Sequence, residues 1–210
     1  MNDHKIIKVK IIRHSERLDF SYPIYWLFCF GHYWSDSPLT KNGYNNAKNK
    51  GVDLVKDDFT PKYIYTSPYN RTMATATEIK KTFPKSEIII EPLLSEHQPY
   101  FKHTINLYPD GIPTSYQGED TEFSYPETYE QFSKRVKFIM FKLFEKSDND
   151  ILIVTHGELL KAYIIFLQNK FIDLTLDPGS LPYLTTLSFI YDKTTHEIID
   201  QSIQIEKNKK

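Results

Sequence analysis

The order of apolar and polar positions along the chain predicts strands that alternate with helices. Short apolar runs rich in Ile and Val predict strands, and apolar positions three or four residues apart predict helices. The predicted strands cover residues 5–12, 62–65, 87–90 and 151–154, followed by a closing hairpin at 183–191 and 197–204. The predicted helices cover residues 40–56, 69–82, 126–146 and 158–168. This pattern is typical of an α/β fold, a three-layer α/β/α sandwich with a mostly parallel central sheet.

Local residue chemistry supports several of these elements. Thr40 is a suitable N-cap for the first long helix, and Pro126 is expected in the first turn of the third. Residues 151–154 are apolar throughout, which is typical of a parallel strand covered on both faces.

Two segments follow neither pattern. Eight aromatic side chains fall within residues 20–34 without a helical period, and we interpret about 20–36 as an aromatic-rich insertion. Residues 95–125 form a predicted long loop, and loops of that length in compact domains are usually functional or disordered. Because no repeat or interdomain linker interrupts the rest, we expect a single domain over residues 1–210.

Charge and composition exclude several classes of protein. The 26 basic and 27 acidic residues give a formal net charge of −1. The chain therefore lacks the excess of basic residues that is typical of a nucleic-acid-binding protein. Cys29 is the single cysteine, so neither an intrachain disulfide nor a cysteine zinc cluster can form. No apolar run reaches the roughly 20 residues of a membrane helix, and no signal peptide precedes the first strand. We expect a cytoplasmic protein without nucleic-acid or membrane partners, for which a homodimer is compatible with the sequence.

The arginines are few and unevenly placed. Only four of the 26 basic residues are arginine, and three of them follow predicted strands. Arg13 and Arg17 follow the first strand, and Arg71 follows the second at a helix start, where anions are favoured. The planar arginine group binds carboxylate or phosphate through two parallel hydrogen bonds, which lysine cannot reproduce. Codon bias explains the abundance of lysine but not these positions.

Two histidines and a carboxylate join the arginines at the same predicted edge. His14 follows the first strand, Glu96 the third and His156 the fourth. Ligands of open α/β sheets gather at the carboxyl ends of the strands. Each residue alone has an ordinary explanation, since a lone histidine is usually structural and a lone surface arginine pair contributes ~0–1 kcal/mol. Their joint placement favours a functional site.

These residue types suit phosphoryl transfer. Arginines neutralise a phosphate dianion and stabilise charge on its oxygens during transfer. A neutral imidazole can attack phosphorus, and nearby arginines keep it neutral by disfavouring the imidazolium. A carboxylic acid can protonate the leaving oxygen and then, as a carboxylate, activate water. The scheme requires no metal and no cofactor.

Five sequence blocks, in order, carry a resemblance to a known family. They are RHSER at residues 13–17, SPLTKNGYNNAKNKG at 37–51, YTSPYNRTMATATEI at 65–79, EPLLSE at 91–96 and VTHGELL at 154–160. The chain resembles branch 1 of the histidine phosphatase superfamily, which has the phosphoglycerate-mutase-like fold. The string RHSERLD at residues 13–19 resembles the RHxERxD group of suppressor tyrosine phosphatases and ecdysteroid-phosphate phosphatases.

The resemblance implies a role for each residue of the cluster. It makes His14 the phosphorylated nucleophile and Glu96 the proton donor. Arg13, Arg71 and His156 complete the phosphate pocket, and Arg17 is a further phosphate-site arginine. The sequence departs from the family at Ser15, where a glycine is usual, so the geometry of that turn is open. Glu158 is a second candidate acid, although a glutamate favoured by the helix dipole is the simpler interpretation.

The substrate is expected to be a phosphorylated small molecule or phosphoprotein. We hypothesise that aromatic residues of the insertion partly line the mouth of the site and favour aryl or bulky phosphates such as phosphotyrosine. A satellite hydrophobic cluster is an equally weighted explanation. The residues concerned are Tyr22, Tyr25, Trp26, Phe28, Tyr33 and Trp34.

Two alternative functions remain open from the sequence. A phosphoglycerate mutase or bisphosphatase would use the same pocket, but mutases usually have Ser and Asn in the string where this chain has Arg17 and Phe20 or its neighbours. A non-catalytic phospholigand-binding protein of the same fold would usually have lost a catalytic position, and every such position is filled here.

Overall fold

The computed structural model describes residues 5–29, 36–98, 123, 126–171 and 177–208. One sheet of six strands lies at its centre, in the order β3-β2-β4-β1-β5-β6. The strands are β1 Ile6–Arg13, β2 Tyr63–Thr66, β3 Glu87–Ile90, β4 Ile151–Thr155, β5 Thr186–Asp192 and β6 Glu197–Glu206. The helices are α1 Leu18–Ser21, α2 Pro23–Cys29, α3 Lys41–Lys56, α4 Asn70–Lys80, α5 Tyr129–Lys146 and α6 Gly157–Lys170, with a 3-10 turn at Pro92–Leu94.

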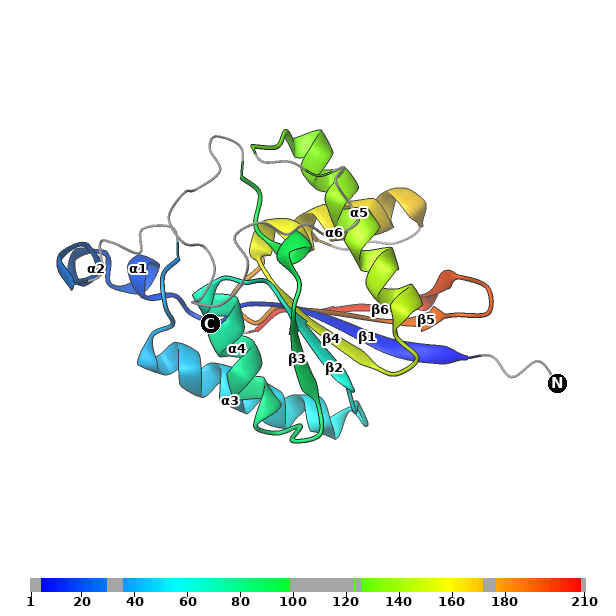
Figure 1. Ribbon diagram of the computed structural model, residues 1–210, viewed down its shortest axis with the longest axis horizontal. Coiled ribbons are helices and arrows are strands. Elements are labelled where there is room, and N and C mark those ends of the chain that lie inside the picture. The colour runs from blue at the N-terminus through cyan, green and yellow to red at the C-terminus, as the bar shows by residue number, and fades with distance from the viewer. Residues whose placement is uncertain (1–4, 30–35, 99–122, 124–125, 172–176, 209–210) are drawn as a thin grey trace.

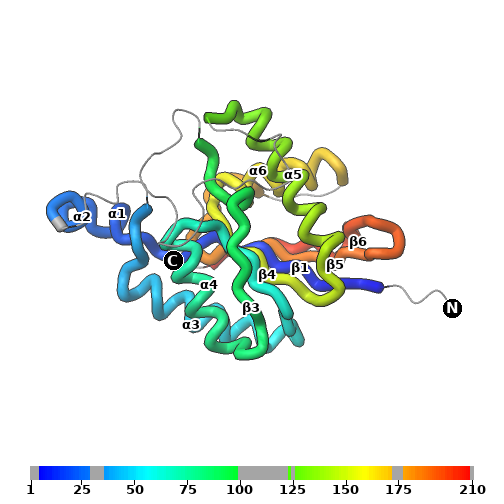
Figure 2. The backbone as a smooth tube through the Cα atoms, viewed as in Figure 1, coloured from blue at the N-terminus to red at the C-terminus, as the bar shows by residue number. Residues whose placement is uncertain are grey.

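Helices cover both faces of the sheet, which confirms the α/β layer prediction. Helices α3 and α4 lie on one face, and α5 and α6 lie on the other (Figure 1 and Figure 2). Strand β4 is buried along its whole length and alternates between the two cores. Ile151 and Ile153 belong to the core under α5 and α6, whereas Leu152 and Val154 belong to the core under α3 and α4.

The sheet is mostly parallel, as predicted. Strands β3, β2, β4 and β1 run parallel, whereas β5 pairs antiparallel with both β1 and β6. The predicted closing hairpin is therefore confirmed, but its first strand begins at Thr186 rather than at residue 183. Leu184 interrupts the extended backbone just before it, because its φ of 61° is left-handed.

Two local predictions were wrong. Helix α5 begins at Tyr129 rather than at Pro126, because Thr128 and Gln131 form a capping box that fixes the N-terminus of the helix there. The segment at residues 20–34 was interpreted as lacking a helical period, but its described part, up to residue 29, contains the end of α1 and all of α2. Pro23 occupies the first turn of α2, where its missing N–H costs nothing. Most of the 95–125 loop lies outside the described residues. None of the described helices is long and apolar enough to cross a membrane.

The strand register brings three loops to one edge of the sheet. Arg13 pairs with Thr155, and Thr66 pairs with Val154, so β1, β2 and β4 end together. Beyond the strands, the backbone N–H of His14 donates to Thr155 O over 2.8 Å. The residues that follow these strands are thereby held side by side at the carboxyl edge.

Candidate active site

His14 is the first residue after β1 and lies within this edge. Its side chain is 1% exposed, and Nδ1 lies 2.8 Å from the carbonyl oxygen of Ser15. Because a carbonyl only accepts hydrogen bonds, Nδ1 carries the proton of the neutral ring, and Nε2 keeps its lone pair. Burial, with Arg71 as the next cause, holds the pKa of His14 well below its usual value. The ring is therefore neutral at pH 7, and the lone pair of Nε2 is available.

His156 lies beside it at the N-cap of α6. The two rings are 5.5 Å apart between centroids, and His156 Nε2 lies 2.8 Å from Ser67 Oγ in the loop after β2. Its other ring nitrogen, Nδ1, lies 3.6 Å from Glu96 Oε2. Burial and then Arg71 also hold the pKa of His156 well below its usual value. Both imidazoles are thus neutral and face the same space.

Arg71 joins helix α4 to the predicted acid. Its side chain is 1% exposed, and Nη2 donates to Glu96 Oε2 over 2.7 Å. Glu96 follows the 3-10 turn after β3 and keeps 26% of its side chain exposed. The guanidinium also stacks over Tyr69, whose ring contacts His156 at 4.9 Å between centroids. The predicted proximity of Arg71, Glu96 and His156 is present in the structure.

Asp36 is a buried carboxylate that sequence reasoning missed. It accepts hydrogen bonds from Asn70 N and Asn70 Nδ2, each at 2.7 Å, and so caps α4 one residue before Arg71. Asp36 Oδ1 is 3.7 Å from Arg71 Nη1. Burial raises the pKa of Asp36 to about 6, against the opposing pull of Arg71. The signal in the sequence was an acidic residue directly before the block at residues 37–51.

Arg13, the last residue of β1, reaches the loop before β5. Its Nη1 donates to Leu181 O, and its guanidinium lies 4.6 Å from the centre of the Tyr183 ring. Tyr183 also lies 5.7 Å from His14 between ring centroids, although it was assigned to the closing strand from sequence. A Cβ on Gly157 would lie 3.1 Å from Arg13 Nε, so a glycine gives the guanidinium room at the start of α6. Burial lowers the pKa of Arg13, yet the group stays cationic at pH 7.

Arg17 is held differently from the other two arginines. Its Nε donates to Asp19 Oδ1 over 2.8 Å, Nη2 bonds the other carboxylate oxygen, and the guanidinium lies over Phe20. Its charge still acts on the site, because it is one of the causes that lower the pKa values of His14 and His156. In this structure Arg17 is therefore a neighbouring charge that is paired with a carboxylate.

Ser15 fits the turn after the histidine without crowding it. It is fully buried, and its hydroxyl donates to Gly43 O over 2.8 Å. Its backbone N–H donates to Thr75 Oγ1 over 3.0 Å, which ties the turn to α4. The serine side chain points toward α3, where its hydroxyl is hydrogen-bonded. The turn therefore accommodates a serine in place of the usual glycine.

The site combines cationic side chains with buried polar atoms that lack a hydrogen-bond partner among the described residues. Arg13 Nε and His156 Nδ1 are buried and have no hydrogen-bond partner among the described residues. Polar atoms in such positions suit an anionic ligand that would complete their hydrogen bonds. The described residues contain no group of three or more His, Cys, Asp or Glu side chains that could hold a metal ion. Partial desolvation and Glu96 raise the pKa of Glu158 beside the site.

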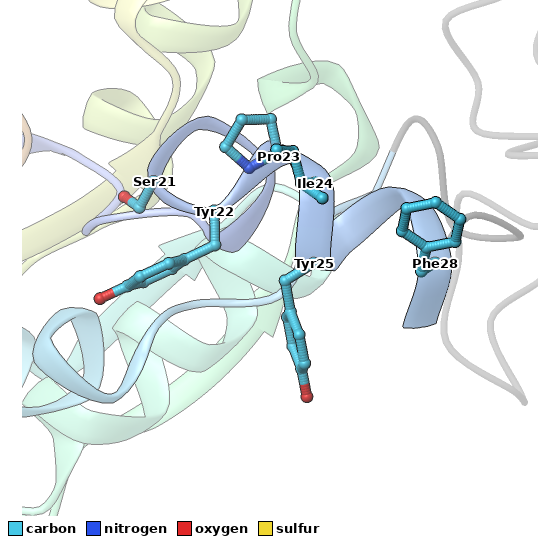
Figure 3. A pocket seen from close by; sticks show the side chains of 6 residues that line it. All are labelled: Ser21, Tyr22, Pro23, Ile24, Tyr25 and Phe28. Atoms are coloured by element: carbon cyan, nitrogen blue, oxygen red, sulfur yellow. The ribbon is translucent and has the colours of Figure 1, made fainter.

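Two surface hollows are found near Arg13 and at the aromatic segment. A hollow of about 550 Å³ is lined by Arg13, Glu16, Ser21, Asn46, Ser180, Pro182, Tyr183, Leu184 and Asn208. A second, of about 600 Å³, is lined by Ser21, Tyr22, Pro23, Ile24, Tyr25 and Phe28 (Figure 3). Ser21 lines both, so the aromatic side chains adjoin the hollow that reaches Arg13. Trp26, predicted at the mouth, is instead buried, and Tyr33 and Trp34 lie outside the described residues.

Sequence comparison identifies the family. The family model for the histidine phosphatase superfamily (branch 1) matches residues 31–190. The chain belongs to this superfamily. It is 63% identical over 201 residues to an uncharacterized phosphoglycerate mutase family protein of Acanthamoeba polyphaga mimivirus, covering 96% of this chain and 98% of that protein. It is 27% identical over 200 residues to the ecdysteroid-phosphate phosphatase of Drosophila melanogaster, covering 73% of this chain but only 26% of that protein.

Solved structures agree with the fold. The ecdysone phosphate phosphatase from Bombix mori, crystallised with tungstate, gives a TM-score of 0.67 at 20% identity, covering 97% and 96% of the two chains. A phosphoglycerate mutase from Bacillus anthracis gives 0.61 at 19% identity, covering 98% and 94%. These similarities show that the chain has the phosphoglycerate-mutase-like fold.

Proposed function

We propose that the protein is a metal-independent phosphomonoesterase that works through a phosphohistidine on His14. The observation that carries this proposal is the orientation of His14, whose Nδ1 is bonded to Ser15 O while burial and Arg71 keep the ring neutral. A neutral imidazole with Nε2 free of the proton is a nucleophile toward phosphorus. His14, Arg13, Arg71, His156 and Glu96 are the catalytic residues of this scheme.

The arginines and the second histidine bind the phosphate. Arg13 and Arg71 flank the pair of imidazoles and neutralise the dianion, and Arg17 adds a more distant positive charge. With Ser67 donating to Nε2, His156 carries its proton on Nδ1 and donates it to a phosphoryl oxygen. Arg13, Arg17, Arg71 and His156 are therefore assigned to substrate binding.

Glu96 moves the proton in both halves of the reaction. His14 Nε2 forms a bond to phosphorus while the bond from phosphorus to the leaving oxygen breaks, and that oxygen takes the proton of the Glu96 carboxylic acid. Glu96, now a carboxylate, takes a proton from water as the water attacks phosphorus. The bond from phosphorus to Nε2 then breaks, which releases inorganic phosphate and restores both groups.

The leaving group is assigned to the hollows beside Arg13. A phosphate held at Arg13 directs its organic group past Tyr183 toward Ser21, and beyond Ser21 lie Tyr22, Tyr25 and Phe28. Flat aromatic surfaces favour aryl or bulky apolar groups over sugars. The proposed substrates are accordingly aryl or bulky phosphates such as phosphotyrosine, on a small molecule or on a protein.

The test is a comparison of two histidine variants across a substrate panel in EDTA. His14→Asn removes the nucleophile, and His196→Asn is its matched control on the exposed turn before β6, where a φ of 59° suits asparagine. We expect hydrolysis of 4-nitrophenyl phosphate and phosphotyrosine to be lost in the first variant and unchanged in the second. Turnover that survives His14→Asn would refute the proposal, and so would cofactor-dependent phosphoglycerate interconversion without hydrolysis.

A further inference from the structure

Arg135 is the one arginine outside the catalytic motifs, and it is completely buried. It lies in α5 with 0% of its side chain exposed. Its Nε donates to Glu127 Oε2 over 2.9 Å, and Nη2 bonds the other oxygen of the same carboxylate. Burying such a pair is costly, so it is weak evidence for a stabilising role by itself. Its remaining contacts indicate a different role.

The Nη1 side of the guanidinium holds the turn that carries Glu96. Arg135 Nη1 donates to Leu93 O over 2.6 Å and to Ser95 O over 3.0 Å. These carbonyls belong to the middle residue of the 3-10 turn and to the residue directly before Glu96. Only a planar group with several N–H donors can bond a carboxylate on one side and two carbonyls on the other.

The residues after Glu96 are fastened to the same place. The backbone N–H of Glu127 donates to Gln98 O over 3.1 Å, and His97 Nε2 lies 3.2 Å from Glu127 O. The His97 ring also stacks on Phe132 of α5, with 4.9 Å between centroids. Glu96 therefore lies between two backbone segments that are both attached to the start of α5, while its carboxylate reaches Arg71 and His156.

We propose that Arg135, together with Glu127, is a positioning pair that sets the place of the Glu96 carboxyl group. This inference rests on the proposed role of Glu96 as proton donor. General acid catalysis depends on hydrogen-bond reach between the acid and the leaving oxygen. Loosening the hold on the Leu93 and Ser95 carbonyls shifts Glu96 relative to Arg71 and His156. The phosphate-binding side chains themselves stay in place, because they are carried by β1, α4 and the start of α6. Proton donation then weakens while phosphate binding persists.

The test uses Arg135→Lys, which keeps the charge and loses the fork. Leaving-group dependence separates the roles, because phenyl phosphate needs a proton on its leaving oxygen far more than 4-nitrophenyl phosphate does. We expect kcat/KM to fall about 30-fold for phenyl phosphate and less than about 3-fold for 4-nitrophenyl phosphate, within the range of general acid catalysis. The inhibition constant of inorganic phosphate should stay within about twofold, since the anion-binding groups are unchanged.

A double-mutant cycle tests whether the effect passes through Glu96. In a Glu96→Gln background, Arg135→Lys should reduce phenyl phosphate turnover less than about twofold, because coupled residues are not additive. Glu127→Gln, which has nearly the same shape, is the second variant and should repeat the pattern. Lys134→Gln is the control, since Lys134 neighbours Arg135 on α5 but pairs only with exposed Glu130 among the contacts described.

Several results would overturn the inference. Equal losses for both substrates, or the same loss with and without Glu96, would assign the pair to stability alone, and so would failure of both variants to fold. Absence of His14-dependent turnover in the unsubstituted protein would instead refute the proposed function, so the two failures are distinguishable.

Discussion

The carboxyl edge of the sheet and the α1–α2 segment both depart from the usual pattern of apolar side chains inside and ionisable ones outside. The sheet edge buries ionisable side chains, and the α1–α2 segment exposes apolar ones. At the sheet edge, His14, Arg71 and His156 are at most 1% exposed although they are ionisable. In α1 and α2, Ile24 and Phe28 are 73% and 82% exposed although they are apolar. Both arrangements cost free energy, since buried polar or charged groups and exposed apolar surface are each unfavourable.

The two regions differ in how firmly their side chains are held. Every buried ionisable group at the edge is held by named neighbours, such as Ser15 O for His14 and Glu96 for Arg71. Among residues 20–28, the part of the aromatic segment whose side chains the structure describes, Trp26 is buried and the others are exposed. A fixed anion site beside an open apolar surface suits a constant phosphate and a variable organic group.

The largest expected effect on turnover comes from changing an arginine at the carboxyl edge of the sheet. Arg71→Lys keeps one charge but loses the fork that reaches Glu96, so we expect kcat/KM to fall about 100- to 1,000-fold. Arg17→Lys should cost about tenfold at most, because Arg17 is already paired with Asp19 and acts at a distance. Steady-state kinetics on 4-nitrophenyl phosphate measures both. Equal losses would contradict the different roles of the two arginines.

The buried carboxylate of Asp36 gives a stability effect with a defined sign. Its pKa is raised to about 6 in the folded protein from an ordinary value of 3.8, so the folded state binds the proton more tightly than the unfolded state. The stabilisation from this proton is present below the ordinary pKa and is lost as pH rises through the folded value. Relative to Asp36→Asn, the free energy of unfolding should fall by about 2 kcal/mol between about pH 4.5 and 7.

Urea unfolding of the two proteins at several pH values measures this difference. A difference that stays constant across the range would mean that Asp36 titrates normally. The carboxylate would then be held by Arg71 and Asn70 more strongly than its burial disfavours it.

Ser15→Gly restores the residue usual in the family and tests the turn after the nucleophile. The variant loses the hydroxyl bond to buried Gly43 O, so the free energy of unfolding should fall by about 1–2 kcal/mol. Turnover should stay within about threefold, since the hydroxyl points away from His14. Thermal unfolding and kinetics on one preparation check both. A large gain in turnover would show that the serine does crowd the pocket.

The smallest effect is expected from changing the exposed aromatic side chains of the α1–α2 segment. Replacing Tyr22, Tyr25 and Phe28 by serine should lower the ratio of aryl to sugar phosphate kcat/KM about fivefold, consistent with the energy of aromatic contacts. Replacing Val52 and Val55 by serine on the exposed surface of α3 is the control and should leave the ratio unchanged. An unchanged ratio in the aromatic variant would remove these residues from substrate selection.

The sequence was sufficient to predict that the residues that follow the strands lie close together. Strand ends in an open parallel sheet meet by topology, so His14, Arg71, Glu96 and His156 could be placed together from local patterns alone. It was insufficient where distant segments determine the geometry. Asp36 caps a helix 34 residues further along the chain, and Tyr183 meets His14 from a loop before β5.

The aromatic segment shows a second limit. Short helices such as α2 have too few residues to display a helical period, and their stability comes from packing rather than propensity. Trp26 is the residue that packs, although sequence alone did not distinguish it from its exposed neighbours. Arg135 could not be linked to Glu96 for a similar reason, since its partners are backbone carbonyls about 40 residues away.

The most direct test of the central claim is to look for the covalent intermediate. The purified protein is mixed with 4-nitrophenyl phosphate in EDTA, quenched in base within one turnover, and analysed for phosphate bound to the chain. We predict acid-labile, base-stable phosphate on His14, present with His196→Asn and absent with His14→Asn. Turnover without phosphate on His14, or labelling that persists in His14→Asn, would contradict the account.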